Sequence, residues 1–212
     1  MHILDTGPIF KFLTNDCTRE LLLALGHNPV SVPAAVEFEI RDTPTRRPQF
    51  ERAVTQWDRL PSRFKQVLPD DPSDELRQCC RSVFGVEFEQ MYATHKDRGE
   101  NMAILHAVRL ARAGEQVVVV CDDEAGSTMI RRQARALAMQ HMRGLHVPGG
   151  QITHADTLLL LEWAIAKGGF NGDRAQFLKR YAAMAALDEA LPKDVKATGL
   201  TKSPPWPPVA TV

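Results

Sequence analysis

Short apolar runs alternate with longer amphipathic segments along most of this chain. Three runs have the length and composition of buried strands: residues 2–4, 30–32 and 117–120. Four segments carry apolar side chains at helical spacing: residues 100–112, about 126–139, 157–166 and 174–187. Because strands alternate with helices, the pattern predicts an α/β fold with a mainly parallel central sheet.

The middle of the chain is more polar, and its elements are predicted from spacing and turn signals. Residues 43–60 predict one amphipathic helix in which Phe50, Val54 and Trp57 form a packing stripe rather than a base-stacking platform. Ser73 is placed to cap a helix that begins at Asp74. A last short strand is expected near residues 145–147.

A length of 212 residues, 44% of them hydrophobic, suits one globular domain with a substantial core. We expect residues 1–150 to form the main domain and residues 151–190 to form a helical extension packed on it. Residues 191–212 include the run PPWPP and little periodicity, so they predict a flexible, proline-rich tail.

The charge and cysteine content narrow the class of protein. The chain has 26 basic residues (Lys plus Arg) and 26 acidic residues (Asp plus Glu), so no overall electrostatic field draws it to nucleic acid. Any nucleic-acid-binding site must therefore be a local basic patch. The four cysteines form no CxxC pair, and neither a signal-peptide pattern nor an apolar run of membrane-spanning length is present. These features predict a reduced, soluble, cytoplasmic protein with no membrane partner.

Four carboxylates stand where the predicted elements would gather them. Asp5 ends the first strand and Asp122 follows the strand at 117–120, and the carboxyl ends of parallel strands share one edge of a sheet. Glu39 lies in the helix after the second strand, and Glu100 lies in the first turn of the helix at 100–112. We therefore expect all four side chains to face one crevice.

Such a cluster repels itself unless a cation is bound. Carboxylate oxygens suit Mg²⁺ or Mn²⁺, which lower the pKa of a bound water and neutralise charge on a phosphate. The pattern thus predicts a Mg²⁺- or Mn²⁺-dependent nuclease that hydrolyses phosphodiester bonds. Its metal ligands and catalytic residues would be Asp5, Glu39, Glu100 and Asp122.

Two ligand positions remain open at this level. Glu37 replaces Glu39 if the helix register differs, and Asp97 competes with Glu100. Each acid also has a plain structural alternative, as a helix cap or as a charge on a solvated face. Asp123 is a supporting residue with two candidate roles, a fifth ligand or the cap of the next helix, and the cap is the expected one.

Basic residues follow the second acidic loop. Arg131, Arg132 and Arg135 are candidate contacts to an RNA backbone, and an ordinary solvated helix face explains them equally well. The seven histidines show no metal-ligand spacing, and we expect His106 to be a packed or surface residue.

Four pieces of the chain resemble the PIN-domain family, which includes the toxin ribonucleases of VapC type. They are residues 3–7 (ILDTG), 32–40 (VPAAVEFEI), 99–103 (GENMA) and 120–123 (VCDD). The resemblance implies a PIN-like three-layer α/β/α fold with extra C-terminal helices and endoribonuclease activity. It assigns the family's acids to Asp5 with Thr6 beside it, Glu39, Glu100 and Asp122, whereas Cys121 departs from the Thr or Ser common there.

The resemblance also implies partners. A VapC-like toxin cleaves RNA, forms a homodimer and is inhibited by a small antitoxin protein. One alternative is a catalytically weak PIN-like scaffold that binds RNA or protein. Another is a receiver-like signalling domain, which would carry its acidic pair after the first strand rather than at Asp122 and Asp123.

Overall fold

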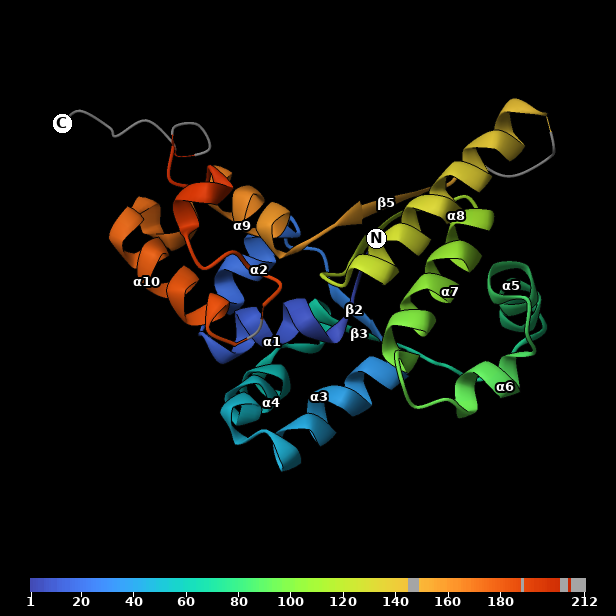
Figure 1. Cartoon of the computed structure of the whole chain (residues 1–212), viewed down its shortest axis with the longest axis horizontal. Coiled ribbons are helices and arrows are strands. Elements are labelled where there is room, and N and C mark those ends of the chain that lie inside the picture. Colours follow the sequence, from blue (N-terminus) through green and yellow to red (C-terminus); the bar gives the residue numbers. More distant parts are fainter. Residues whose placement is uncertain (145–148, 188, 203–205, 207–212) are drawn as a thin grey trace.

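The fold is organised around one sheet of five parallel strands (Figure 1). The computed structural model describes residues 1–144, 149–187, 189–202 and 206. The strands are β1 (His2–Leu4), β2 (Val30–Pro33), β3 (Lys65–Leu68), β4 (Gln116–Val120) and β5 (Gln151–Ala155). Their spatial order is β3-β2-β1-β4-β5, and every pair is parallel. The predicted α/β class and parallel sheet are confirmed.

Helices connect the strands and cover the sheet. The α-helices are α1 (Thr6–Thr14), α2 (Thr18–Ala24), α3 (Ala34–Arg46), α4 (Glu51–Arg59), α5 (Asp74–Phe84), α6 (Phe88–Ala93), α7 (Arg98–Arg112), α8 (Glu124–Met142), α9 (Thr157–Ala166) and α10 (Arg174–Ala185). Short 3-10 helices are Pro48–Phe50, Ser62–Phe64, Gly169–Gly172 and Val195–Thr198. The predicted helices at 100–112, 157–166 and 174–187 correspond to α7, α9 and α10.

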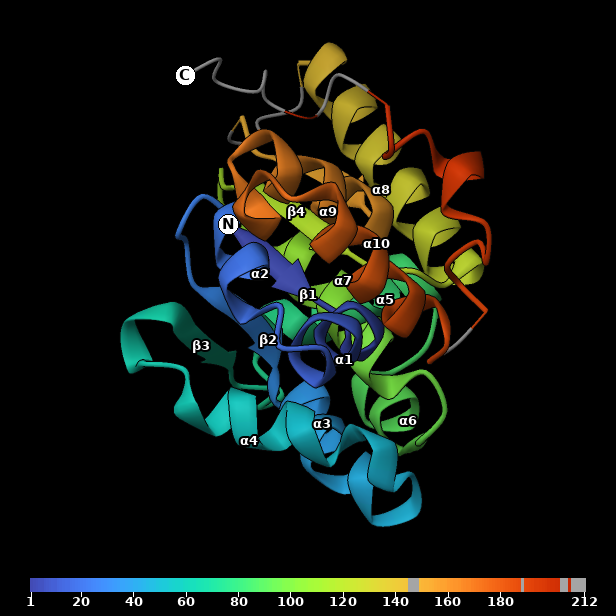
Figure 2. The same ribbon diagram turned by 90° about the vertical axis from the view of Figure 1, so that its left-hand side faces the viewer.

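Each strand sends alternate side chains to opposite faces of the sheet, and both faces are covered. Leu4 and Val120 join an apolar cluster with α1, α2, α9 and α10, whereas Ile3 and Val119 join a second cluster with α5, α7 and α8. Figure 2 shows the first group of helices in front of the strands. The arrangement is consistent with a three-layer α/β/α fold.

Two strands escaped the sequence pattern. β3 is a short edge strand of which only Leu68 is fully buried, so its residues lack an apolar run. β5 pairs with β4 along its whole length, so the sheet continues past residue 150. The strand expected at 145–147 lies outside the described residues.

The single helix expected over residues 43–60 is wrong. α3 runs to Arg46, and Arg47 leaves the helical region with φ −134° and ψ 81° because it precedes Pro48. A 3-10 turn then leads into α4. Two of the three predicted stripe residues are buried, Phe50 and Trp57, and Phe50 stacks on Phe10 with ring centroids 4.3 Å apart. Val54 is only partly buried.

The predicted helix cap, the cysteines and the lack of a membrane-spanning run can be located in the structure. The Ser73 side chain caps α5 by accepting from the N–H of Leu76 at 3.2 Å, which confirms the predicted cap. All four cysteines are buried and unpaired. Within the described residues, no helix is both long and apolar enough to cross a membrane.

The segment expected as a tail contributes to the core. Leu191, Leu200 and Trp206 are buried in the same cluster as α9 and α10. The Trp206 ring meets the Phe177 ring edge-to-face at 5.5 Å, and its Nε1–H donates to the Leu200 carbonyl at 2.7 Å. The described part of this segment is therefore packed against the domain.

Candidate functional site

The strand order creates a switch point between β1 and β4, because the chain builds β1, β2 and β3 to one side before crossing to β4. Ligands of open parallel sheets usually bind beyond the carboxyl ends of the strands at such a point. Asp5 follows β1 directly, and its N–H donates to the Val120 carbonyl at the end of β4 at 2.9 Å. Asp122 follows β4 by two residues. Two of the expected carboxylates thus flank the switch point.

Gly7 lies between these two carboxylates in the first turn of α1. A Cβ atom built on it would lie 3.7 Å from Oδ2 of Asp122 and 4.0 Å from Oδ2 of Asp5. Both side chains therefore reach toward the same small space above the helix start. The structure thus places the Asp5 and Asp122 carboxylates close together.

Glu39 joins the cluster through α3. Its Oε2 accepts a short hydrogen bond from the Thr6 hydroxyl, and its Oε1 accepts from the N–H of Gly99 at 3.2 Å. These two bonds link α1, α3 and α7 around one carboxylate. Thr6 therefore orients Glu39, which gives it the supporting position that the sequence suggested.

Glu100 approaches from the first turn of α7. The Cys121 thiol donates to its Oε2 with an S···O distance of 3.7 Å. A Cβ built on Gly126 would lie 2.5 Å from Cδ of Glu100, so a side chain at the start of α8 would displace this carboxylate from its present position. Cys121 thus makes a polar contact with Glu100.

The structure distinguishes the alternative acids. Glu37 accepts from Nε1 of Trp57 at 3.1 Å and pairs with Arg41 at 3.3 Å, away from Asp5 and Glu100. The Asp97 side chain is 58% exposed at the start of α7, with Lys96 4.0 Å away. Glu37 is therefore engaged by other partners, whereas Asp97 lies close enough to Glu100 for its charge to contribute to the raised pKa of Glu100.

Burial and mutual repulsion make two of the carboxylates hard to ionise. Burial raises the pKa of Asp5 to about 6, the charges of Glu39 and Asp122 add to the rise, and the N–H groups of Thr6 and Gly7 oppose it. Burial also raises the pKa of Glu100 to about 7, with a contribution from the charge of Asp5. The cluster therefore favours a bound cation or bound protons near neutral pH.

Asp122 has partners that the sequence analysis missed. Nζ of Lys11 donates to its Oδ2 at 2.9 Å, and the Lys11 side chain is only 1% exposed. The Thr157 N–H donates to Oδ1 at 2.7 Å, while the Thr157 hydroxyl donates to Oδ2 at 2.6 Å. A signal for Lys11 existed, because a single lysine inside the apolar run IFKFL of α1 must be buried with a counter-charge.

The remaining candidates lie around the rim. Asp123 caps α8 by accepting from the N–H groups of Ala125 and Gly126 at 2.8 Å and 3.1 Å, as expected. The three candidate RNA-contacting side chains of α8 are exposed to solvent: Arg131, Arg132 and Arg135. Their exposure leaves them accessible to a phosphate backbone.

The donor chemistry of the crevice suits a hard divalent cation, but its carboxylates are not closed around a common point. Among the described residues, no three Asp, Glu, His or Cys side chains are grouped tightly enough to hold a metal ion. Like charges repel when no cation lies between them, and Asp122 is turned into Lys11 and Thr157. Asp5, Glu39 and Glu100 are the oxygen donors that could close on an ion by side-chain rotation.

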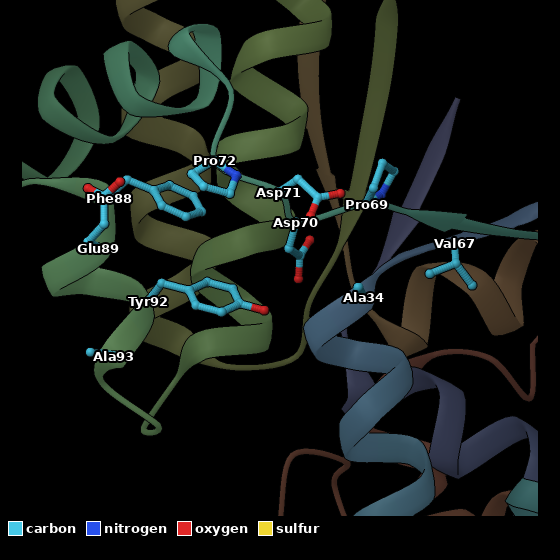
Figure 3. A pocket seen from close by; sticks show the side chains of 10 residues that line it. All are labelled: Ala34, Val67, Pro69, Asp70, Asp71, Pro72, Phe88, Glu89, Tyr92 and Ala93. Carbon is cyan, nitrogen blue, oxygen red and sulfur yellow. The ribbon is translucent and has the colours of Figure 1, made fainter.

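A separate cavity of about 640 Å³ opens at the end of β3 (Figure 3). Phe88 and Tyr92 of α6 line one side, Ala34 and Val67 line the other, and Asp70 lies between them. Asp70 is bound by the Ala35 N–H at 2.6 Å and by Nε2 of His106 at 2.9 Å. His106 is 1% exposed and has a structural partner, in agreement with the packed role expected for it.

No protein-family model, curated protein or solved structure matches the chain. The functional interpretation therefore depends on the geometry of the crevice.

Proposed function

We propose that this protein is a Mg²⁺- or Mn²⁺-dependent endoribonuclease with a PIN-like fold. The observation that carries the proposal is the gathering of Asp5, Glu39 and Glu100 beside Asp122 at the switch point between β1 and β4. These residues come from four separate parts of the chain. Three glycines leave space around their carboxylates: Gly7, Gly99 and Gly126.

The residues of the site would have different roles in catalysis. Asp5, Glu39 and Glu100 would bind the divalent ion, with Thr6 and the Gly99 N–H orienting Glu39. A bound ion supplies an activated water and neutralises charge on the scissile phosphate.

Asp122 lies beside these residues and is held by hydrogen bonds from Lys11 and Thr157. Its Oδ1 retains one lone pair that would bind the ion or a water on the ion. Arg131, Arg132 and Arg135 would draw the RNA backbone toward the crevice.

The rival functions differ in what they require. A receiver-like sheet has the strand order 2-1-3-4-5, whereas this sheet has the order 3-2-1-4-5. The strand order therefore does not match the receiver-like alternative. A catalytically weak scaffold remains the second candidate, and the pairing of Asp122 with Lys11 favours it because it removes one acid from free use. As part of this proposal, the protein would be the toxin of a toxin–antitoxin pair. It would form a homodimer and be inhibited by a small antitoxin protein.

The experiment incubates the purified full-length chain with structured and unstructured RNA in Mg²⁺, Mn²⁺ or EDTA. We expect cleavage in both metals and none in EDTA. RNA binding without cleavage in any condition would favour the scaffold. Cleavage that persists in EDTA would exclude the metal-dependent mechanism.

A further inference from the structure

Lys11 is a charged side chain placed inside the acidic crevice rather than on its rim. It projects from α1, one turn after Gly7, and its ammonium group contacts Asp122 at 2.9 Å with 1% of the side chain exposed. A Cβ built on Gly7 would lie 3.8 Å from Nζ of Lys11 and 4.0 Å from Oδ2 of Asp5. The ammonium group therefore occupies the space beside the two carboxylates that flank the switch point.

The hydrogen bonds of Asp122 limit what else it can bind. Its Oδ2 accepts from both Lys11 and the Thr157 hydroxyl, which uses both lone pairs of that oxygen. Its Oδ1 accepts from the Thr157 N–H and keeps one lone pair. In two-metal nucleases the ions lie about 3.5–4 Å apart and share carboxylate ligands, which requires more free oxygens than Asp122 retains.

We propose that Lys11 is a resident cation of the crevice, whose ammonium group holds the position that a second divalent ion would need. The site then takes at most one divalent ion, bound by Asp5, Glu39 and Glu100, while Lys11 and Thr157 hold Asp122 to one side. Lys11 acts as a positioning residue because its ammonium group contacts Asp122. The number of ions rests on the proposed function, whereas the cation position of Lys11 does not.

The test is a count of bound Mn²⁺ in the full-length protein by equilibrium titration, with free Mn²⁺ read from its EPR signal. We expect one ion in the parent and two in Lys11→Met, which keeps an unbranched side chain one atom shorter and removes its charge. Lys167→Met is the matched control, because Nζ of Lys167 donates to a backbone carbonyl, that of Ala24, at 2.8 Å. Lys11→Arg keeps the charge and should retain the parent count.

Thermal melting supplies a readout that needs no activity. Removing one partner of a buried ion pair is destabilising, so Lys11→Met should melt below the parent in EDTA. Mn²⁺ should then raise its melting temperature more than it raises that of the parent. If Lys11→Met does not fold in any condition, Lys11→Gln retains a donor for Asp122 without the charge and should show the same gain of an ion.

The outcomes separate this inference from the proposed function. A parent that binds two ions, or an uncharged Lys11 variant that gains none, overturns the inference while leaving the nuclease possible. A parent that binds no Mn²⁺ and cleaves no RNA removes the nuclease. A gain of one ion in the Lys11 variant would still support Lys11 as the resident cation.

Discussion

The N–H of Gly99 donates to Oε1 of Glu39 at 3.2 Å, and a Cβ atom on Gly99 would lie 2.8 Å from the same oxygen. Gly99 stands in the first turn of α7, sixty residues along the chain from Glu39. Alanine favours a helix over glycine by about 1 kcal/mol, so Gly99→Ala should not unfold the protein. It should instead push the Glu39 carboxylate out of the crevice.

We expect Gly99→Ala to weaken Mn²⁺ binding at least about tenfold, which is typical of disturbing the orientation of a ligand. The measurement is a Mn²⁺ titration beside a melting curve. Gly149→Ala is the control, because nothing lies within 4 Å of its Cβ position. Equal Mn²⁺ affinity in the two variants would show that Glu39 does not bind the ion.

Glu39 and Glu37 offer a matched pair on one helix. Glu39 faces Thr6 and Gly99, whereas Glu37 faces Trp57 and Arg41. Glu39→Gln should lower the rate of RNA cleavage about a hundredfold, the usual scale for removing one electrostatic group from an active site. Glu37→Gln should keep most of the parent rate. The reverse order in a cleavage assay would return Glu37 to the site.

Asp5→Asn should stabilise the metal-free protein in a pH-dependent way. Folding raises the pKa of Asp5 from 3.8 to about 6, so the folded state favours the protonated form. Its contribution to stability is complete below about pH 4 and is lost as the pH rises through about 6. Asparagine has no charge to lose, so we expect a gain on the order of 2 kcal/mol at pH 8 and little change at pH 4.

Urea unfolding in EDTA at pH 4 and pH 8 measures this difference. Glu100 should add a similar loss of stability in the parent, since its pKa rises from 4.5 to about 7. A stability gain of Asp5→Asn that is the same at both pH values would contradict the burial of a repelled carboxylate.

Trp206 tests whether the C-terminal segment belongs to the folded domain. It is 4% exposed against Phe177 and Leu200, so Trp206→Ala should cost about 3–5 kcal/mol of unfolding free energy. Phe38→Ala is the control, because Phe38 is 56% exposed and should cost much less. Denaturant unfolding that does not separate these variants would support the dispensable tail that the sequence suggested.

The fold could be predicted where the pattern was local and strong. β1, β2 and β4 are short and mainly apolar, and α7 has an apolar face at helical spacing, so the local pattern sufficed. β3 has the polar composition of an exposed edge, and its strand state depends on pairing with β2. Such tertiary contacts leave no periodic signal in the residues themselves.

The candidate site could be predicted in part for the same reason. Asp5 and Asp122 end strands, so the topology alone places them together. The choice of Glu39 over Glu37 required the contacts of α3 with α1 and α7. Lys11 and Thr157 are linked to Asp122 across 111 and 35 residues, and no spacing rule relates positions so far apart.

The proposed nuclease requires a divalent ion held by Asp5. The most direct measurement compares RNA cleavage by the parent and Asp5→Asn in Mg²⁺ and Mn²⁺, with Asp58→Asn as a control whose carboxylate pairs with Arg41 on the surface. We expect EDTA-sensitive cleavage by the parent and Asp58→Asn, and none by a folded Asp5→Asn. Cleavage by Asp5→Asn at the parent rate would contradict it.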